Sequence, residues 1–264
     1  PYHDMGLIGG VLQPLYGGFP VTLMSPVDFL QQPIRWLQAI SRYQATTSGG
    51  PNFAYDLCLR KITPAQIETL DLSSWEVAFT GAEPVRAETI EEFATTFAPC
   101  GFHKEAFYPC YGMAETTLIV SGGLKTKPPV IRQIDSSALE QNRVVASTDN
   151  WESRTIVGCG RTWLNQNLLI VNPDTCTRCS PEEIGEIWVS GASIAKGYWN
   201  RPQETAQAFD AYLADTKEGP FLRTGDLGFV QDDELFITGR IKDIIIIRGQ
   251  NHYPHDIELT VEKS

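Results

Sequence analysis

The sequence lacks the features that mark nucleic-acid-binding and membrane-spanning proteins. Its 264 residues carry 21 Lys and Arg against 32 Asp and Glu, a formal net charge of −11, without a basic cluster. Nucleic-acid phosphates bind to clustered Lys and Arg, so we expect no nucleic-acid partner. The densest apolar run is the four isoleucines 244–247, whereas a membrane-spanning helix needs roughly 20 apolar residues. We therefore expect no membrane span.

The chain also lacks an N-terminal signal and a dense set of cysteines. The first residues, PYHDMG, contain no initiator Met at position 1 and no charged-then-apolar pattern, so we interpret the chain as the interior of a longer protein. Six cysteines are scattered along it. Cys176 and Cys179 have zinc-knuckle spacing, but no second pair accompanies them, so reduced thiols are the better interpretation. Such cysteines suit a reducing cytoplasm, where we expect the protein to act.

Strand-like and helical segments alternate through the first half of the chain. This alternation predicts an α/β fold with a mainly parallel sheet and flanking helices. Ligands bind beyond the carboxyl ends of such strands. Three predicted strand ends carry glycine, at 48–50, 80–83 and 111–112, where a backbone can approach a ligand, although glycine also simply ends strands. The predicted strands are 20–25, 45–50, 76–81 and 106–112, and the predicted helices are 33–43, one from about Phe53, and 86–97.

The second half consists of short strand-like runs separated by Gly, Asn and Asp turns. These runs predict a small distorted β-barrel subdomain. They lie at 155–160, 167–174, 185–191, 223–230 and 234–239, and a helix interrupts them at 200–209.

Four parts follow from these patterns. Residues 1–124 are expected to form the α/β subdomain. Residues 125–154 are polar and irregular, which predicts a surface insertion outside the core. Residues 155–239 are expected to form the β-rich, barrel-like subdomain, and residues 240–264 a hinge and the truncated start of a C-terminal lid domain.

Six motifs, in order, resemble the adenylate-forming superfamily of acyl-CoA synthetases, luciferases and peptide-synthetase adenylation domains. Each motif alone is weak, but six in order over nearly the whole chain are specific. Within this superfamily, the residues of several motifs and the position of the 125–154 insertion resemble those of the fatty acyl-AMP ligases. The six are YHDMGL (2–7), GAEPV (81–85), YGMAETT (111–117), GEIWVSGASIAKGYWNRPQETAQAF (185–209), RTGDLG (223–228) and GRIKDIIIIRG (239–249), and RGQNHYPHDIE (248–258) also matches that branch.

This resemblance implies an enzyme that activates a fatty acid with ATP and Mg²⁺, giving acyl-AMP and pyrophosphate. The acyl group then passes to the phosphopantetheine thiol of an acyl carrier protein, for lipid, polyketide or lipopeptide synthesis. The family's phosphate loop lies upstream of residues 2–7, and its adenylation lysine lies late in the C-terminal domain. Neither motif occurs in this sequence, so we interpret the chain as an internal fragment that is inactive alone.

The resemblance assigns the nucleotide base and the metal to the first half. Tyr111 is expected to stack on adenine, and Glu115 to hold Mg²⁺, since a hard cation prefers carboxylate oxygen. Taken alone, Tyr111 suits a packed core aromatic equally well, and Glu115 a solvated residue in the first turn of a helix. Ala114 stands where the family often has Thr, so the side chain at this position lacks the hydroxyl that would contact the α-phosphate. The other expected nucleotide-binding residues are Gly81, Ala82 and Glu83, mainly through backbone, and Gly112, Met113 and Ala114.

The resemblance assigns the ribose, the hinge and the acyl group to other residues. Asp226 is expected to accept hydrogen bonds from the ribose hydroxyls, and Arg240 to reach the ribose or phosphates. Lys242 matches the hinge of the C-terminal domain. His3 matches a position near the reacting carboxylate. Taken alone, Asp226 suits a turn cap, Arg240 a surface ion pair, and His3 a structural or solvated residue. The apolar residues Leu7, Ile8, Val11 and Leu12 suit an acyl channel or a packed core.

Two other functions compete with the fatty acyl-AMP ligase. One is a long-chain acyl-CoA synthetase, which the insertion and the RGQNHYP segment disfavour. The other is a non-catalytic nucleotide- or acyl-binding scaffold. A phosphate loop before this sequence and a lysine motif after it, in the complete protein, would exclude the scaffold.

Overall fold

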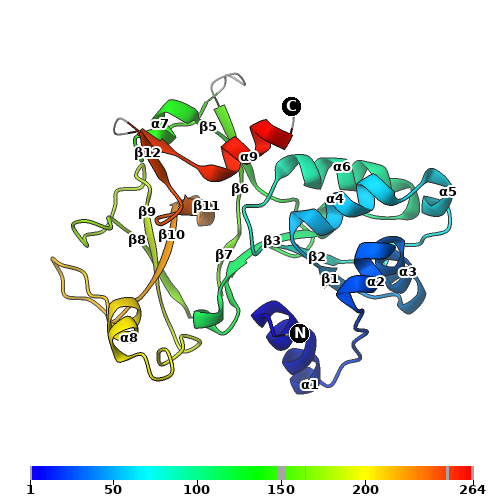
Figure 1. The fold of residues 1–264 in the computed structure, drawn as a ribbon, viewed down its shortest axis with the longest axis horizontal. Coiled ribbons are helices and arrows are strands. Elements are labelled where there is room, and N and C mark those ends of the chain that lie inside the picture. The colour runs from blue at the N-terminus through cyan, green and yellow to red at the C-terminus, as the bar shows by residue number, and fades with distance from the viewer. Residues whose placement is uncertain (1, 148–152, 164, 248–249, 263–264) are drawn as a thin grey trace. The chain divides into compact units, whose positions relative to one another are not determined.

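The computed structural model describes residues 2–147, 153–163, 165–247 and 250–262 (Figure 1). The chain divides into two compact units, Pro1–Pro129 and Val130–Ser264. Each unit contains its own strands, helices and buried residues. The finer predicted boundaries, at 124/125, 154/155 and 239/240, stay predictions. Within the described residues, no helix combines the length and apolar character that crossing a membrane requires.

The strands of the first unit follow the order β1-β2-β3-β4. β1 pairs with β2 and β2 with β3 in parallel, while β4 runs antiparallel to β3. The predicted α/β class with a mainly parallel sheet is therefore confirmed. The strands are β1 (Thr47–Gly49), β2 (Val77–Thr80), β3 (Phe107–Gly112) and β4 (Ile119–Gly122).

Apolar periodicity explains the helices of the first unit. In α3 (Ile34–Tyr43), the buried residues Ile34, Leu37 and Ile40 recur every three positions and so share one face. α4 (Asn52–Lys61) and α6 (Ala87–Phe97) lie side by side above β1, β2 and β3 in Figure 1. The other helices are a π-helix (Met5–Leu12), α1 (Gln13–Gly17), α2 (Pro26–Gln31), α5 (Pro64–Ile67) and 3₁₀ turns at Ala98–Cys100, Lys104–Ala106 and Ala114–Thr116.

Aromatic side chains fill the core of the first unit. Tyr55 packs edge-on against Phe93, with ring centroids 5.0 Å apart, and Trp75 packs edge-on against Trp36 at 5.3 Å. Edge-to-face pairs of this kind are a favoured geometry of aromatic rings. The Tyr55 hydroxyl donates to the Phe79 carbonyl oxygen (2.9 Å) near the end of β2. Burial raises the pKa of this hydroxyl well above its ordinary value, so it stays a hydrogen-bond donor.

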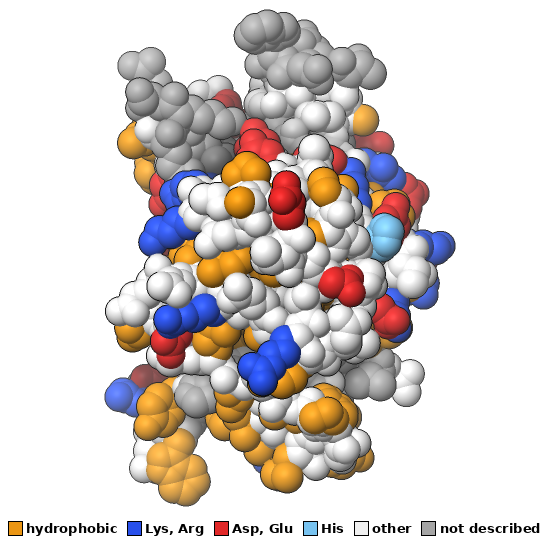
Figure 2. Space-filling view, turned by 90° about the vertical axis from the view of Figure 1, so that its right-hand side faces the viewer, with side chains coloured by type: hydrophobic (Ala, Val, Ile, Leu, Met, Phe, Trp, Pro, Cys, Tyr) orange, Lys and Arg blue, Asp and Glu red, His pale blue; other side chains and the backbone are white. Residues whose placement is uncertain are grey.

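The N-terminal segment differs from the sequence prediction. The strand predicted at 20–25 is wrong, because residues 19–25 form neither a strand nor a helix. Val21 and Leu23 are residue types that favour strands, but this preference depends on packing against a neighbouring strand. Both side chains are exposed here. No residue of the π-helix is fully buried: Ile8 and Val11 are half-buried, and Leu7 and Leu12 are exposed. Figure 2 shows exposed hydrophobic side chains gathered at the lower end of one face, below charges of both signs.

The second unit is built on antiparallel strands in the order β11-β10-β9-β8. Residues 158–160 pair with the other edge of β11, where the Cys159 N–H donates to the Leu235 carbonyl oxygen (2.7 Å), and the described residues show no closed barrel. Two strand pairs, β5-β6 and β12-β13, accompany it. The strands are β5 (Ile131–Asp135), β6 (Ser153–Val157), β7 (Arg161–Thr162), β8 (Asn167–Val171), β9 (Gly185–Ser190), β10 (Leu222–Gln231), β11 (Glu234–Arg240), β12 (Ile245–Ile247) and β13 (Gln250–His252), and the helices are α7 (Ser136–Glu140), α8 (Pro202–Phe209) and α9 (Pro254–Glu262).

The predicted surface insertion contributes to the core of the second unit. Residues 148–152 lie outside the described residues, but residues 131–140 form β5 and α7. Ile134, Leu139 and Val144 are buried in one cluster with Phe229 and Phe236. The prediction of a segment outside the core is therefore wrong for this stretch. These three cluster residues lie five positions apart, which matches neither helical nor strand periodicity, so the sequence pattern did not show them.

This placement predicts that Leu139 is a stabilising core residue. Leu139 is 2% exposed, so Leu139→Ala should lower the free energy of unfolding by about 2–5 kcal/mol through lost burial and an unfilled cavity. Val145 is 40% exposed, and Val145→Ala serves as the control. Urea denaturation followed by circular dichroism measures both. Equal, small effects of the two substitutions would show that the segment lies outside the core.

Candidate active site

The turn after β2 and the end of β3 meet at one edge of the first sheet. β2 and β3 are neighbouring parallel strands, so residues 81–83 and Tyr111 leave the sheet on the same side. A Cβ atom on Gly81 would lie 2.5 Å from the Cys110 carbonyl oxygen, which shows how closely the turn approaches β3. The structure thus brings together the two segments that were predicted to contact adenine.

The glycines at these strand ends allow protein segments to approach each other. A Cβ atom on Gly49 would lie 2.0 Å from the Phe79 carbonyl oxygen, and one on Gly112 would lie 1.8 Å from the Leu118 carbonyl oxygen. Real Cβ atoms essentially never come this close to another atom, so each position requires glycine. Backbone packing therefore explains these glycines without a ligand.

Asn52 holds the turn that follows β2. Its side-chain Nδ2 donates to Glu83 Oε1 (2.9 Å) and to the Pro84 carbonyl oxygen (2.8 Å). Its Oδ1 accepts from the backbone N–H of Arg86 (3.0 Å). Asn52 is 3% exposed, and the turn contains Ala82 in the left-handed region at φ +67°. A buried amide with three partners thus stabilises a strained turn.

A compact loop carries the candidate metal ligand. Glu115 is half-buried in the 3₁₀ turn Ala114–Thr116. The backbone N–H of Met113 donates to the Leu118 carbonyl oxygen (2.9 Å), and the Thr116 hydroxyl donates to the Met113 carbonyl oxygen (2.9 Å). These bonds close the connection between β3 and β4, so the position of the carboxylate is set by a short, hydrogen-bonded loop.

His3 lies in the first unit, next to the π-helix. Its Nδ1 atom is 2.7 Å from Asp4 Oδ1, and its side chain is 70% exposed. The π-helix itself approaches the β3–β4 connection, because a Cβ atom on Gly9 would lie 3.5 Å from Leu118 Cδ2. The role of His3 beside the reacting carboxylate stays a prediction.

In the second unit the structure brings Asp226 and Arg240 together. The two residues are paired across β10 and β11, and Arg240 Nε donates to Asp226 Oδ1 (2.7 Å). Asp226 is 6% exposed, whereas the Arg240 side chain is 61% exposed. The Asp226 N–H donates to the Thr224 hydroxyl (3.1 Å). A fixed carboxylate with an accessible guanidinium beside it can bind a hydroxyl-bearing, anionic ligand.

Lys242 lies in a turn between β11 and β12. The backbone N–H groups of Asp243 and Ile244 both donate to the Arg240 carbonyl oxygen (3.1 and 3.2 Å). A short turn between two strands can absorb a change of backbone angles, as a hinge must. Lys242 itself is exposed. Its hinge role stays a prediction, and Arg248 and Gly249 of the adjoining motif lie outside the described residues.

Sequence reasoning missed two buried polar residues, which hold the turn after β2 and residues 223–225 of β10. One is Asn52 and the other is Glu186, which is 2% exposed and accepts hydrogen bonds from Arg223 and from the backbone of Gly225. Glu186 could have been found, because a charged residue inside an otherwise apolar strand is rare unless it has a buried partner. Asn52 gave no comparable signal, since Asn is common where helices begin.

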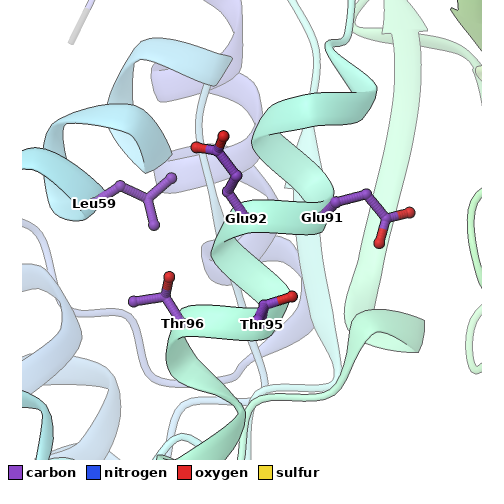
Figure 3. Close-up of a pocket in the computed structure, with 5 residues that line it drawn as sticks. All are labelled: Leu59, Glu91, Glu92, Thr95 and Thr96. Atoms are coloured by element: carbon purple, nitrogen blue, oxygen red, sulfur yellow. The ribbon is translucent and has the colours of Figure 1, made fainter.

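A surface hollow on α4 and α6 contains no candidate site residue. It is lined by Leu59, Glu91, Glu92, Thr95 and Thr96 (Figure 3).

Metal binding and thiol chemistry give no further candidate among the described residues. No three His, Cys, Asp or Glu side chains there could together hold a metal ion. Burial, followed by the charge of Glu183, raises the pKa of Cys179 to about 11, which keeps this thiol protonated near neutral pH.

Comparison with known proteins identifies the family. The AMP-binding enzyme family matches residues 1–199, and the chain belongs to this family. Medium-chain-fatty-acid–acyl-carrier-protein ligase JamA of Moorena producens is 55% identical to the chain, covering 100% of the chain and 45% of that relative. The corresponding ligase TtuA of Teredinibacter turnerae is 48% identical, covering 99% of the chain and 42% of the relative. The chain thus spans less than half the length of these relatives.

Solved structures with the same fold agree with this assignment. The fatty acid AMP ligase from Legionella pneumophila superposes with a TM-score of 0.88 at 50% identity, covering 100% of this chain and 46% of that one. A fatty acyl-adenylate ligase from L. pneumophila, in complex with acyl adenylate and pyrophosphate, gives a TM-score of 0.89 at the same identity and coverage. The predicted resemblance to fatty acyl-AMP ligases is confirmed.

The hydrogen bonds of Asn52 predict that its amide is needed for stability. Asn52→Asp replaces a donor with an acceptor that faces the oxygens of Glu83 and Pro84, so it should lower the free energy of unfolding by about 1–3 kcal/mol. Asn167→Asp, at the exposed start of β8, is the matched control and should change little. Urea unfolding followed by tryptophan fluorescence measures both. If the two variants unfold at the same urea concentration, Asn52 does not hold the turn.

Proposed function

We propose that the complete protein containing this chain is a fatty acyl-AMP ligase that charges an acyl carrier protein. A fatty-acid carboxylate oxygen attacks the α-phosphorus of ATP, the bond to the β-phosphate bridging oxygen breaks, and pyrophosphate leaves. The phosphopantetheine thiol of the carrier protein then attacks the acyl carbonyl carbon. AMP leaves with the electron pair of the broken acyl–oxygen bond, and the thiol proton passes to solvent. We assign the protein to the cytoplasm, where both ATP and carrier proteins are available.

One comparison carries this proposal. A solved ligase that contains acyl adenylate and pyrophosphate matches the whole chain at 50% identity with a TM-score of 0.89. Acyl adenylate and pyrophosphate are the two products of the first step. Relatives 55% and 48% identical are named as acyl-carrier-protein ligases, which supports the second step. Carrier proteins that feed lipid, polyketide or lipopeptide synthesis are the partners we propose.

In the first unit, the proposed roles follow the sheet edge. Tyr111 presents a flat ring at the end of β3, and offset stacking on adenine suits this ring. The turn 81–83 supplies backbone groups beside it, and its geometry is fixed by Asn52. Glu115 lies four residues after Tyr111, in the hydrogen-bonded loop between β3 and β4. In this proposal the chain from Tyr111 to Glu115 runs along the nucleotide from the adenine toward the phosphates. Gly112, Met113 and Ala114 connect the two.

A single carboxylate is enough for the magnesium ion that accompanies ATP. Mg²⁺ in nucleotide enzymes is bound by one or two carboxylates together with substrate phosphates and waters. Glu115, half-buried and on a short loop, is a suitable donor of this kind, and a ready-made cluster of acidic residues is not needed. When bound, the ion offsets the negative charge that builds on the phosphates.

In the second unit, we assign the ribose to Asp226 and the ribose or phosphate oxygens to Arg240. The buried Asp226 carboxylate is already fixed by Arg240 Nε, which leaves it oriented before the nucleotide arrives. Lys242 follows in the turn proposed as the hinge, and His3 is proposed to lie near the fatty-acid carboxylate. The exposed apolar residues of the π-helix, which include Leu7 and Leu12, are candidates for contact with the acyl chain.

Coenzyme A is the alternative acceptor, because relatives 42% identical are named putative fatty-acid–CoA ligases. The test incubates the complete protein with ATP, Mg²⁺ and fatty acid, and adds either a phosphopantetheinylated carrier protein or free coenzyme A. Acyl-carrier protein as the main product supports the proposal. Acyl-CoA formed at an equal or higher rate would replace it with the acyl-CoA synthetase.

We expect the 264-residue chain alone to form no acyl-AMP. Positioned charges around the phosphates dominate this kind of catalysis, and the sequence contains no phosphate loop or adenylation lysine motif. A fatty-acid-dependent ATP–pyrophosphate exchange assay on the purified chain measures this, with the complete protein as the positive control. Exchange at the rate of the complete protein would contradict the expectation.

Glu115→Gln tests the metal ligand. In the complete protein, it should lower kcat for ATP–pyrophosphate exchange by about 10²–10³-fold at saturating Mg²⁺, because charge stabilisation in the transition state is lost. Glu92→Gln removes a carboxylate from the hollow in Figure 3 and is the control that should leave kcat unchanged. A Glu115→Gln enzyme with normal kcat would exclude Glu115 as the metal ligand.

A further inference from the structure

β10 contains a bulge at the position of Asp226. Its pairing with β9 shifts between Arg223, which lies opposite Trp188, and Leu227, which lies opposite Glu186. Residues 224–226 of β10 therefore face a single residue of β9 between these two pairs. A bulge of this kind bends the strand and re-aims the side chains within it, and bulges are frequent beside active sites.

The Glu186 carboxylate fills the inside of this bulge. Its Oε2 accepts from Arg223 Nε (2.9 Å) and from Trp188 Nε1 (2.9 Å), and it lies 2.7 Å from an Arg223 terminal nitrogen. Its Oε1 accepts from the backbone N–H of Gly225 (3.1 Å). The hydrogen bonds to this carboxylate raise the pKa of Arg223. A charge that is 2% exposed is thus matched by one cation and by donors on both of its oxygens.

Gly225 connects the bulge to Asp226 and to the residue that follows Arg240. Its φ of +73° lies in the left-handed region, yet a Cβ atom there would meet no other atom within 4 Å. The position therefore requires glycine for its backbone angle and not for space. Gly225 precedes Asp226 directly, and its carbonyl oxygen accepts from the N–H of Ile241 (2.9 Å), which follows Arg240.

We propose that Glu186 is a positioning residue for nucleotide binding: by holding the Gly225 N–H and Arg223 inside the bulge, it aims the Asp226 carboxylate at the ribose. This inference rests on the proposed role of Asp226. It assigns to Glu186 no contact with the nucleotide. Its effect on ATP affinity therefore passes through Asp226 and disappears when Asp226 is absent.

A double-mutant cycle in the complete protein tests this dependence. Isothermal titration calorimetry measures the Kd for ATP in the wild type, Glu186→Gln, Asp226→Ala and the double variant. We expect Glu186→Gln to raise the Kd about tenfold, and the double variant to bind as Asp226→Ala does. In ATP–pyrophosphate exchange, Glu186→Gln should raise the KM for ATP and leave kcat nearly unchanged, because a ribose contact contributes uniform binding.

Glu234→Gln is the matched control for a purely structural effect. Glu234 is a half-buried carboxylate of the same sheet, and like Glu186 it accepts a hydrogen bond from a glycine N–H, that of Gly160 (2.6 Å). Burial raises the pKa of Glu234. It lies at the far end of the β10–β11 pairing, opposite Gln231, whereas Asp226 lies opposite Arg240. We expect Glu234→Gln to lower the melting temperature as Glu186→Gln does, without raising the Kd for ATP.

Gly225→Ala provides a second variant if Glu186→Gln fails to fold. The added methyl group meets no atom, so the substitution changes only the preferred backbone angle of the bulge, and it should raise the Kd for ATP in the same Asp226-dependent way. Equal losses of affinity with and without Asp226, or unchanged affinity in both variants, would overturn the proposal. If Asp226→Ala itself binds ATP normally, the ribose assignment is what fails.

Discussion

Buried polar groups need hydrogen-bonding partners, and this constraint shapes the turn after β2 in the first unit and the bulge of β10 in the second. In each unit, one buried polar side chain meets it. The Asn52 amide satisfies the turn after β2 through three hydrogen bonds, and the Glu186 carboxylate satisfies the bulge of β10. Without such a partner, a buried polar group costs about 1–3 kcal/mol, which would destabilise the geometry of the turn and of the bulge.

The turn after β2 and the bulge of β10 share three features, although one is in an α/β unit and the other in an antiparallel sheet. In each, a residue with positive φ, Ala82 or Gly225, is followed by a carboxylate, Glu83 or Asp226. A buried side chain from a neighbouring element fixes the turn. Binding residues that are held before the ligand arrives lose little entropy on binding, which favours affinity and orientation. The aromatic core behind β2 adds rigidity through the hydrogen bond from Tyr55 to Phe79.

The sequence predicted most regular elements, because their apolar patterns were strong. The helices at 33–43 and 86–97 and the strands at 76–81 and 106–112 correspond to α3, α6, β2 and β3. Two predictions failed. Residues 20–25 form no strand, because a strand also depends on a neighbouring strand, and residues 131–144 join the core although their apolar pattern was weak. The pairing of Asp226 with Arg240 needed the register of β10 and β11, which no local pattern contains.

Hydrogen–deuterium exchange of the complete protein and of its Asn52→Asp and Glu186→Gln variants tests the central claim, that one buried polar side chain holds each segment. The account predicts that Asn52→Asp speeds amide exchange at 81–86 and that Glu186→Gln speeds it at 223–228, since each variant loses hydrogen bonds that hold its own segment. Unchanged exchange at 81–86 in the first variant and at 223–228 in the second would contradict it.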